Sequence, residues 1–91
     1  MTRAGILKRA AVGDLVHIWW RDIANYTNAN RKRAKCLRAQ NWGLLVHVDQ
    51  GEMRLQYGLY EGDKKKNGDY GAFPVGCIDA VKVIKKGWNN D

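Results

Sequence analysis

Apolar and polar residues alternate with a period of two over several short stretches of the chain, and this period is typical of half-buried strands. The first such stretch follows the turn pair Gly13-Asp14 and runs over residues 15–22. Successive side chains of a strand point to opposite faces, so one set is predicted to face the core and the other to face outward. The inward set is Val16, Ile18 and Trp20, and the outward set is His17, Trp19 and Arg21.

Two further alternating stretches, residues 42–48 and 53–60, predict a central hairpin. They flank a turn, residues 49–52, in which Gly51 can adopt the positive φ that a tight hairpin turn requires. Trp42, at the start of the hairpin, is expected to be structural. The alternation aligns the apolar residues of both strands on one face, which we expect to belong to the core. These residues are Leu44, Val46 and Val48 on one strand and Met53, Leu55, Tyr57 and Leu59 on the other.

The last third of the chain predicts two more strands separated by a tight turn. Residues 70–73 form the first of them, which ends at Pro74 because proline has no backbone N–H to donate to a neighbouring strand. One helical turn is expected between Pro74 and Ile78, followed by the final strand through Val81 and Ile84. Five short strands of this kind are typical of a small all-β barrel, in which closure leaves no exposed edge.

A polar, basic insertion, residues 23–41, separates the first strand from the central hairpin. Its first part, 23–30, is rich in asparagine and is expected to form a loop. Residues 31–40 are mostly good helix formers, with Asn28 or Asn30 available as an N-cap. This composition predicts a short helix, and the alternative is that a strand already begins within residues 35–38.

With 91 residues the chain has room for one domain, which is expected to bury roughly 60 to 65 % of its unfolded surface. We divide it into an N-terminal extension (1–11), the barrel (12–84, with the insertion at 23–41) and a flexible C-terminal tail (85–91). The extension is basic but lacks the apolar stretch of a signal sequence, and no later run approaches the roughly 20 apolar residues of a membrane span. We therefore expect no membrane partner.

The order of these elements resembles that of the SH3-like barrel. A group of small uncharacterised SH3-like proteins from phages and other mobile elements has similar segments, which here are Val12-Gly13-Asp14, Trp42-Gly43-Leu44-Leu45-Val46 and Gly68-Asp69-Tyr70-Gly71 with Phe73-Pro74. The resemblance covers most of residues 12–84. It implies the fold and an adaptable accessory module, and it brings across no catalytic residues. The long basic insertion at 25–38 departs from the simpler members of the group.

The net charge of the chain indicates which class of partner it binds. Sixteen Lys and Arg residues against nine Asp and Glu give a formal net charge of +7, which favours anionic partners such as nucleic acid. The two cysteines, Cys36 and Cys77, form no C-x-x-C pair, so free thiols in a reducing compartment are expected. We therefore expect the protein to be cytoplasmic.

The sharpest candidate for a binding site is the basic part of the insertion, where five cations lie within eight residues. Arginines can fork onto phosphate oxygens, and lysines act as point charges. A second cluster of cations lies in the loop before the fourth strand. The alternative for both clusters is a solvated face that only keeps the protein soluble. The first cluster is Arg31, Lys32, Arg33, Lys35 and Arg38, and the second is Lys64, Lys65 and Lys66.

Aromatic residues beside these charges favour nucleic acid over other anions. Trp19, on the outward face beside Arg21, is placed to stack on nucleobases. Tyr60 borders the lysine loop and offers a further flat surface. The alternative for Trp19 is that it packs beneath the insertion against Tyr26 and Leu37.

Catalysis is the least favoured class. The chain has no serine, no glycine-rich phosphate loop and only two histidines, His17 and His47. A metal site at these histidines would still need one or two more ligands, and the nearest candidates in sequence are Asp14, Asp22 and Asp49. We therefore expect no enzyme activity, no metal and no cofactor. The leading hypothesis is nucleic-acid binding. The others are an accessory protein of a phage or mobile element that docks on a host protein, for instance to counter a defence system, and a homo-oligomer that sequesters a phosphorylated small ligand.

Overall fold

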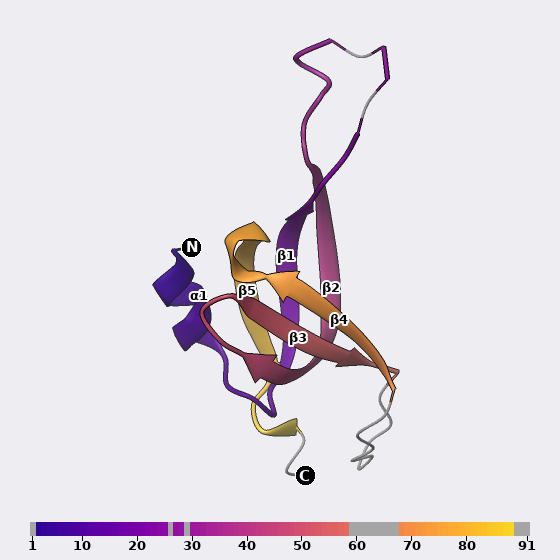
Figure 1. The fold of residues 1–91 in the computed structure, drawn as a ribbon. Coiled ribbons are helices and arrows are strands. Elements are labelled where there is room, and N and C mark those ends of the chain that lie inside the picture. The colour runs from indigo at the N-terminus through magenta and orange to yellow at the C-terminus, as the bar shows by residue number, and fades with distance from the viewer. Residues whose placement is uncertain (1, 26, 29, 59–67, 89–91) are drawn as a thin grey trace.

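The computed structural model describes residues 2–25, 27–28, 30–58 and 68–88, and these contain one short α-helix and five antiparallel strands (Figure 1). A 3-10 turn, Val75–Cys77, precedes the last strand, and this confirms the helical turn predicted after Pro74. The elements are α1 (Arg3–Arg9), β1 (Leu15–Asp22), β2 (Leu37–Val48), β3 (Glu52–Tyr57), β4 (Asp69–Pro74) and β5 (Ile78–Lys85).

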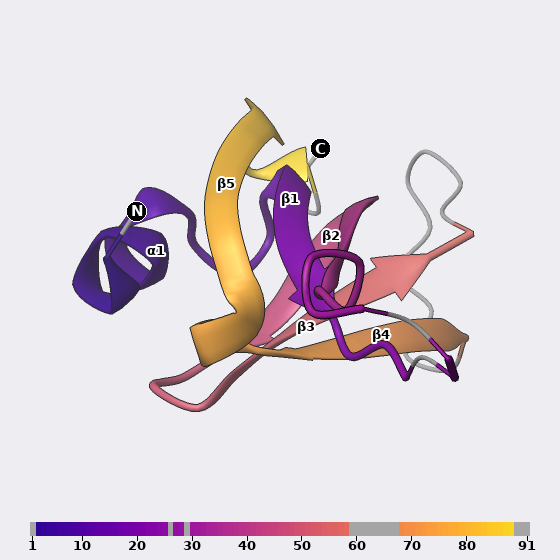
Figure 2. The same cartoon turned by 90° about the horizontal axis from the view of Figure 1, so that it is seen from above.

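The five strands form one open sheet in the order β4-β3-β2-β1-β5. Strand β2 is long enough to pair with β1 over Leu37–Leu44 and then with β3 from Leu44 onward. The sheet bends strongly, so that β3 and β4 run across the direction of β1 and β5 (Figure 2). The predicted all-β class is confirmed. The sheet is not closed, so the SH3-like barrel stays a prediction.

Two local features of β2 set the bend and the composition of the core. A Cβ added at Gly43 would lie 2.8 Å from the carbonyl oxygen of Gln56, so the absence of a side chain lets β3 cross closely. A register shift between Leu45 and His47 is typical of a β-bulge, which displaces the alternation by one residue. Leu45 is therefore fully buried, whereas Val46, which the simple alternation assigned to the core, is only half-buried.

The core lies inside the bent sheet and is closed on one side by α1. The helix packs along β5, and its Arg9 Nε donates a hydrogen bond of 3.3 Å to the carbonyl oxygen of Val81. Thr2 caps its first turn, since Thr2 Oγ1 accepts from the backbone N–H of Gly5. No helix in the described part of the chain is long and apolar enough to cross a membrane. The core residues are Ile6, Ala10, Val16, Ile18, Leu45, Met53, Leu55, Phe73, Val75, Ile78 and Val81.

Asp14 joins segments from both ends of the chain to the start of β1. Its carboxylate is buried and accepts hydrogen bonds from the backbone N–H of Ala11 (3.0 Å) and of Gly87 (2.9 Å). These two bonds, assisted by Lys86, hold the pKa of Asp14 below its usual value. The tail that was expected to be flexible is thus attached at Gly87, and residues 89–91 lie outside the described residues.

The insertion does not form the predicted helix over residues 31–40. Asn30 caps a single turn, because its Oδ1 and its carbonyl oxygen accept from the backbone N–H groups of Arg33 and Ala34, all at 3.1 Å. From Leu37 onward the chain pairs with β1, beginning opposite Asp22. This pairing outweighs the helix propensity of the segment, which is a weak preference by itself. The alternative, a strand that begins within residues 35–38, is the correct one.

Candidate functional site

The hairpin of β1 and β2 extends beyond the core as a projecting arm, which we define as the described residues 23–25, 27–28 and 30–38 (Figure 1). It gives the molecule its elongated shape, with principal extents of 50 × 27 × 20 Å. Residues 30–38 of the arm are all exposed. The structure therefore places the first predicted cation cluster together on one exposed element. These cations are Arg31, Lys32, Arg33, Lys35 and Arg38.

Four of the five cations of the arm have no carboxylate partner in the described part of the chain. No Asp or Glu occurs between residues 23 and 48 of the sequence. Within the described ranges, Arg31, Lys32, Arg33 and Arg38 form no ion pair with a carboxylate. A projecting element with several such cations creates a local positive potential that attracts anionic polymers.

The outer face of β1 continues from the arm toward the body of the protein. Strand register places the outward residues of β1 beside those of both neighbouring strands, and Trp19 lies between Gln40 of β2 and Ala80 of β5. The predicted alternation of β1 is confirmed for Val16 and Ile18, which are fully buried on the opposite face, whereas Trp20 is half-buried and packs against the core. Arg21 Nε forms an ion pair of 3.0 Å with Asp79 Oδ1 on this outer face.

Three aromatic rings form a row on the outer face, and we call Trp42, His17 and Trp19 the ring row. The centroid of the His17 ring lies 4.3 Å from that of Trp42, with the planes stacked, and 3.7 Å from that of Trp19. His17 Nε2 is also hydrogen-bonded to Gln40 Oε1 at 2.8 Å, which fixes the imidazole ring. Trp42, which was assigned a structural role from the sequence, stacks on His17 and is 54 % exposed.

One part of the alternative for Trp19, packing against Leu37 beneath the insertion, can be compared with the structure. Leu37 is 55 % exposed, which contradicts a buried cluster of Trp19 with Leu37 beneath the insertion. Tyr26, the other expected member of that cluster, lies outside the described residues. The ring that contacts Trp19 is that of His17.

A hollow of about 570 Å³ lies beside Trp19 at the base of the arm. It exists because the neighbours of two large indoles, Ala39 and Ala80, have small side chains. The indole of Trp20 is fixed in place, since its Nε1 donates a hydrogen bond of 2.7 Å to Asn41 Oδ1. The lining residues are Trp19, Trp20, Arg38, Ala39, Gln40, Asp79 and Ala80.

A second, smaller hollow of about 300 Å³ follows the arm itself and is lined by Arg33, Lys35, Cys36, Leu37 and Arg38. Arg38 lines both hollows. The cations of the arm and the outer face of β1 are therefore parts of one continuous surface.

Other predicted site residues lie where the structure gives no description. Tyr60, Lys64, Lys65 and Lys66 are outside the described residues. The neighbouring part of that loop that is described, from Gly68, leads directly into β4. The candidate site is therefore built from the arm and β1.

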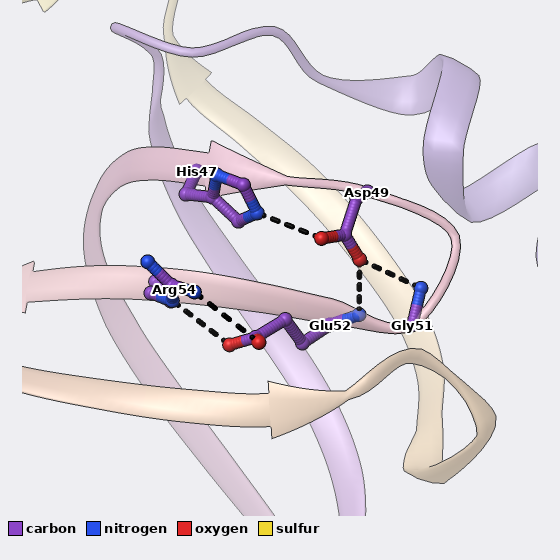
Figure 3. Close-up of polar contacts among 5 residues, drawn as sticks. All are labelled: His47, Asp49, Gly51, Glu52 and Arg54. Atoms are coloured by element: carbon purple, nitrogen blue, oxygen red, sulfur yellow. Dashed lines mark hydrogen bonds and ion pairs between the residues drawn. The ribbon is translucent and has the colours of Figure 1, made fainter.

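The tip of the hairpin of β2 and β3 is also charged, but its charges pair with one another (Figure 3). Asp49 Oδ2 lies 2.9 Å from His47 Nε2, and Asp49 Oδ1 accepts from the backbone N–H groups of Gly51 and Glu52. The bond to His47 and these two backbone bonds lower the pKa of Asp49 to about 2. Glu52 is bonded to Arg54 Nε at 2.8 Å, which lowers the pKa of Glu52. This tip stabilises its own turn.

In the described part of the chain, no group of three or more His, Cys, Asp or Glu side chains comes together. His17 is in the ring row and His47 is bonded to Asp49. Cys36 and Cys77 are free cysteines, the first exposed on the arm and the second half-buried after Gly76.

Comparisons of the chain with protein-family models, with curated proteins and with solved structures find no match.

Proposed function

We propose that this protein is a non-catalytic nucleic-acid-binding module of the cytoplasm, with the arm as its phosphate-binding element. The observation that carries the proposal is the set of exposed arm cations without a carboxylate partner in the described structure. A cation held exposed and unpaired keeps its full charge for an incoming phosphate, and each phosphate neutralised releases counterions into solution.

The arrangement suits a phosphate backbone better than a single small anion. Arg31 and Arg33 lie on the turn at the tip of the arm, and Arg38 lies at its base on β2. The guanidinium groups are thus spread along an extended element. A polymer with regularly spaced charges can contact all of them, whereas a small phosphorylated ligand can contact only those that converge on one point.

The fold assignment that accompanies this proposal is the SH3-like barrel. Two observations support it, namely the strand order β4-β3-β2-β1-β5 and the 3-10 turn directly before β5. On this proposal the arm is an insertion between the first two strands of such a barrel, in an accessory protein of a phage or mobile element.

A salt titration tests the proposed function. With five phosphate contacts the affinity for a short DNA or RNA is expected to fall on the order of 500-fold between about 50 and about 200 mM salt. The double variant Arg31→Gln/Arg33→Gln is expected to reduce the slope of log affinity against log salt by about 1.8.

The matched control is Arg3→Gln/Lys8→Gln, which removes the same charge from exposed positions on α1. It is expected to leave the slope nearly unchanged. Binding that does not depend on salt, or an equal effect of both double variants, would count against the arm as a phosphate-binding element.

A second candidate function is docking on a host protein, and the exposed indole of Trp42 favours it. Tryptophan is enriched among the residues that dominate protein interfaces. The test is capture of partners from a nuclease-treated lysate. One protein retained in stoichiometric amount, and released by Trp42→Ala, would support docking over nucleic-acid binding.

A further inference from the structure

We propose that the hollow beside Trp19 receives one unpaired nucleobase, so that the ligand of this protein is single-stranded nucleic acid. The inference rests on the proposed function and deepens it, because it assigns the strand state of the ligand. Aromatic side chains on the surface of small β-sheet modules are the usual platforms for bases that are not paired.

The geometry of the ring row carries the first step. The centroid of the His17 ring lies 3.7 Å from that of Trp19, and Trp19 also lines the hollow, whereas His17 does not. A base that enters the hollow against Trp19 would extend the row by a further ring. The volume, about 570 Å³, is within the range of about 300–1,000 Å³ that is typical of ligand pockets.

The polar groups of the hollow fit a base better than an aliphatic ligand. The oxygen of the Gln40 amide is bonded to His17, and its amide nitrogen, a donor, has no partner among the described residues. Asp79 is paired with Arg21, so its negative charge is compensated. The remaining charge of the lining is that of Arg38, which is positive.

Arg38 supplies the connection between base and backbone. It lines both hollows, so a nucleotide whose base lies against Trp19 has its phosphate near Arg38 and the next phosphates along the arm toward Arg33. A duplex cannot use the same site without extruding a base, which costs stacking and pairing energy. A single strand has no such cost.

The test compares three labelled probes by fluorescence anisotropy at fixed salt, namely a short oligothymidine, the same strand with abasic sites throughout, and a duplex of equal length. The abasic strand keeps every phosphate and lacks only the bases. The intact single strand is expected to bind about tenfold more tightly than the abasic strand and than the duplex.

Two variants test whether the hollow causes the preference for the intact single strand. Trp19→Ala removes the stacking surface, and Ala80→Leu fills the hollow while keeping every charge and ring. Each is expected to reduce the preference for the intact strand to about twofold or less. The matched control, Ala72→Leu, makes the same change at an exposed position of β4 and is expected to keep the tenfold preference.

Failure of this inference can be distinguished from failure of the proposed function. Equal, salt-dependent binding of all three probes would overturn the nucleobase site and leave the arm as a phosphate-binding element. Absence of binding to every probe, or binding that salt does not weaken, would overturn both. A preference for the intact strand that persists in Ala80→Leu would also overturn the site, because the bases would then be recognised elsewhere.

Discussion

The two halves of β2 lie in different surroundings although they belong to one strand. The half next to β3 contributes Leu45 to the core and ends at a tip where Asp49, His47, Glu52 and Arg54 pair their charges. The half next to β1 begins at exposed Leu37 and carries Arg38 at the base of the arm. The first half contributes to the core, and the second exposes its side chains to solvent.

The difference shows which charges of this basic protein are available for binding. A formal net charge of +7 says nothing about where it acts. At the β2–β3 tip the cation Arg54 has a carboxylate, that of Glu52, beside it, and exposed pairs of this kind contribute little to stability. On the arm the nearest carboxylate in sequence is Asp22, at the end of β1. Charge without compensation is therefore a better indicator of a binding surface than the total.

The largest expected effect is a difference in the free energy of unfolding between variants of the two halves of β2. Leu45→Ala is expected to lower the free energy of unfolding by about 2–5 kcal/mol, because it leaves a cavity in the core. Leu37→Ala makes the same change in the other half, where the side chain is 55 % exposed, and is expected to cost less than about 0.5 kcal/mol. Urea denaturation measures both. Similar losses for the two variants would remove the distinction between the halves.

The next effect concerns the point where the halves meet. Gly43→Ala is expected to cost about 1–3 kcal/mol, since the added methyl group would lie 2.8 Å from a backbone oxygen of β3. Gly76→Ala is the control, because its nearest neighbour is the end of the flexible Arg3 side chain at 3.6 Å. An unchanged melting temperature for Gly43→Ala would show that β3 does not cross as closely as described.

A smaller effect is a difference in the salt dependence of nucleic-acid binding between a variant of the arm and a variant of the β2–β3 tip. Arg33→Gln, on the arm, is expected to lower the slope of log affinity against log salt by about 0.9. Arg54→Gln removes a cation that already has a partner, Glu52, and is expected to leave the slope unchanged. Salt titration of both variants with the same single-stranded probe gives the comparison. A larger effect of Arg54→Gln would move the binding surface to the other tip.

The smallest effect is a pH dependence at the β2–β3 tip. The pKa of Asp49 is lowered from 3.8 to about 2 in the folded protein, so its ionised form stabilises the fold above pH 3.8 and this contribution is lost as the pH falls toward 2. Asp49→Asn removes this dependence. The difference in stability between the protein and the variant is expected to be constant at neutral pH and to shrink within that window. Thermal unfolding at several pH values measures it, and a difference that grows on acidification would contradict the assignment.

Local signals in the sequence were sufficient for most strands. The alternation in β1 and the proline before the 3-10 turn predict those elements because both depend on neighbouring residues alone. The helix α1 was missed, although the signal was present, since Thr2 is a good cap and Ile6 and Ala10 are spaced one helical turn apart.

Features that depend on pairing between distant segments could not be predicted in the same way. The bulge after Leu45 shifts the alternation by one residue, and no residue type marks it. The exposure of Trp42 follows from its register opposite His17, and the hollow beside Trp19 follows from Ala80, a residue of β5. The sequence therefore indicated the cations of the arm and not the surface that they border.

The buried carboxylate of Asp14 has a consequence for joining the protein to a fusion partner or to a surface. By holding Gly87 it makes the chain leave the sheet at the end that points away from the arm (Figure 1). A fusion partner or a surface linker joined beyond this point would lie on the side of the molecule opposite the arm. The arm would then remain exposed even when the protein is tethered.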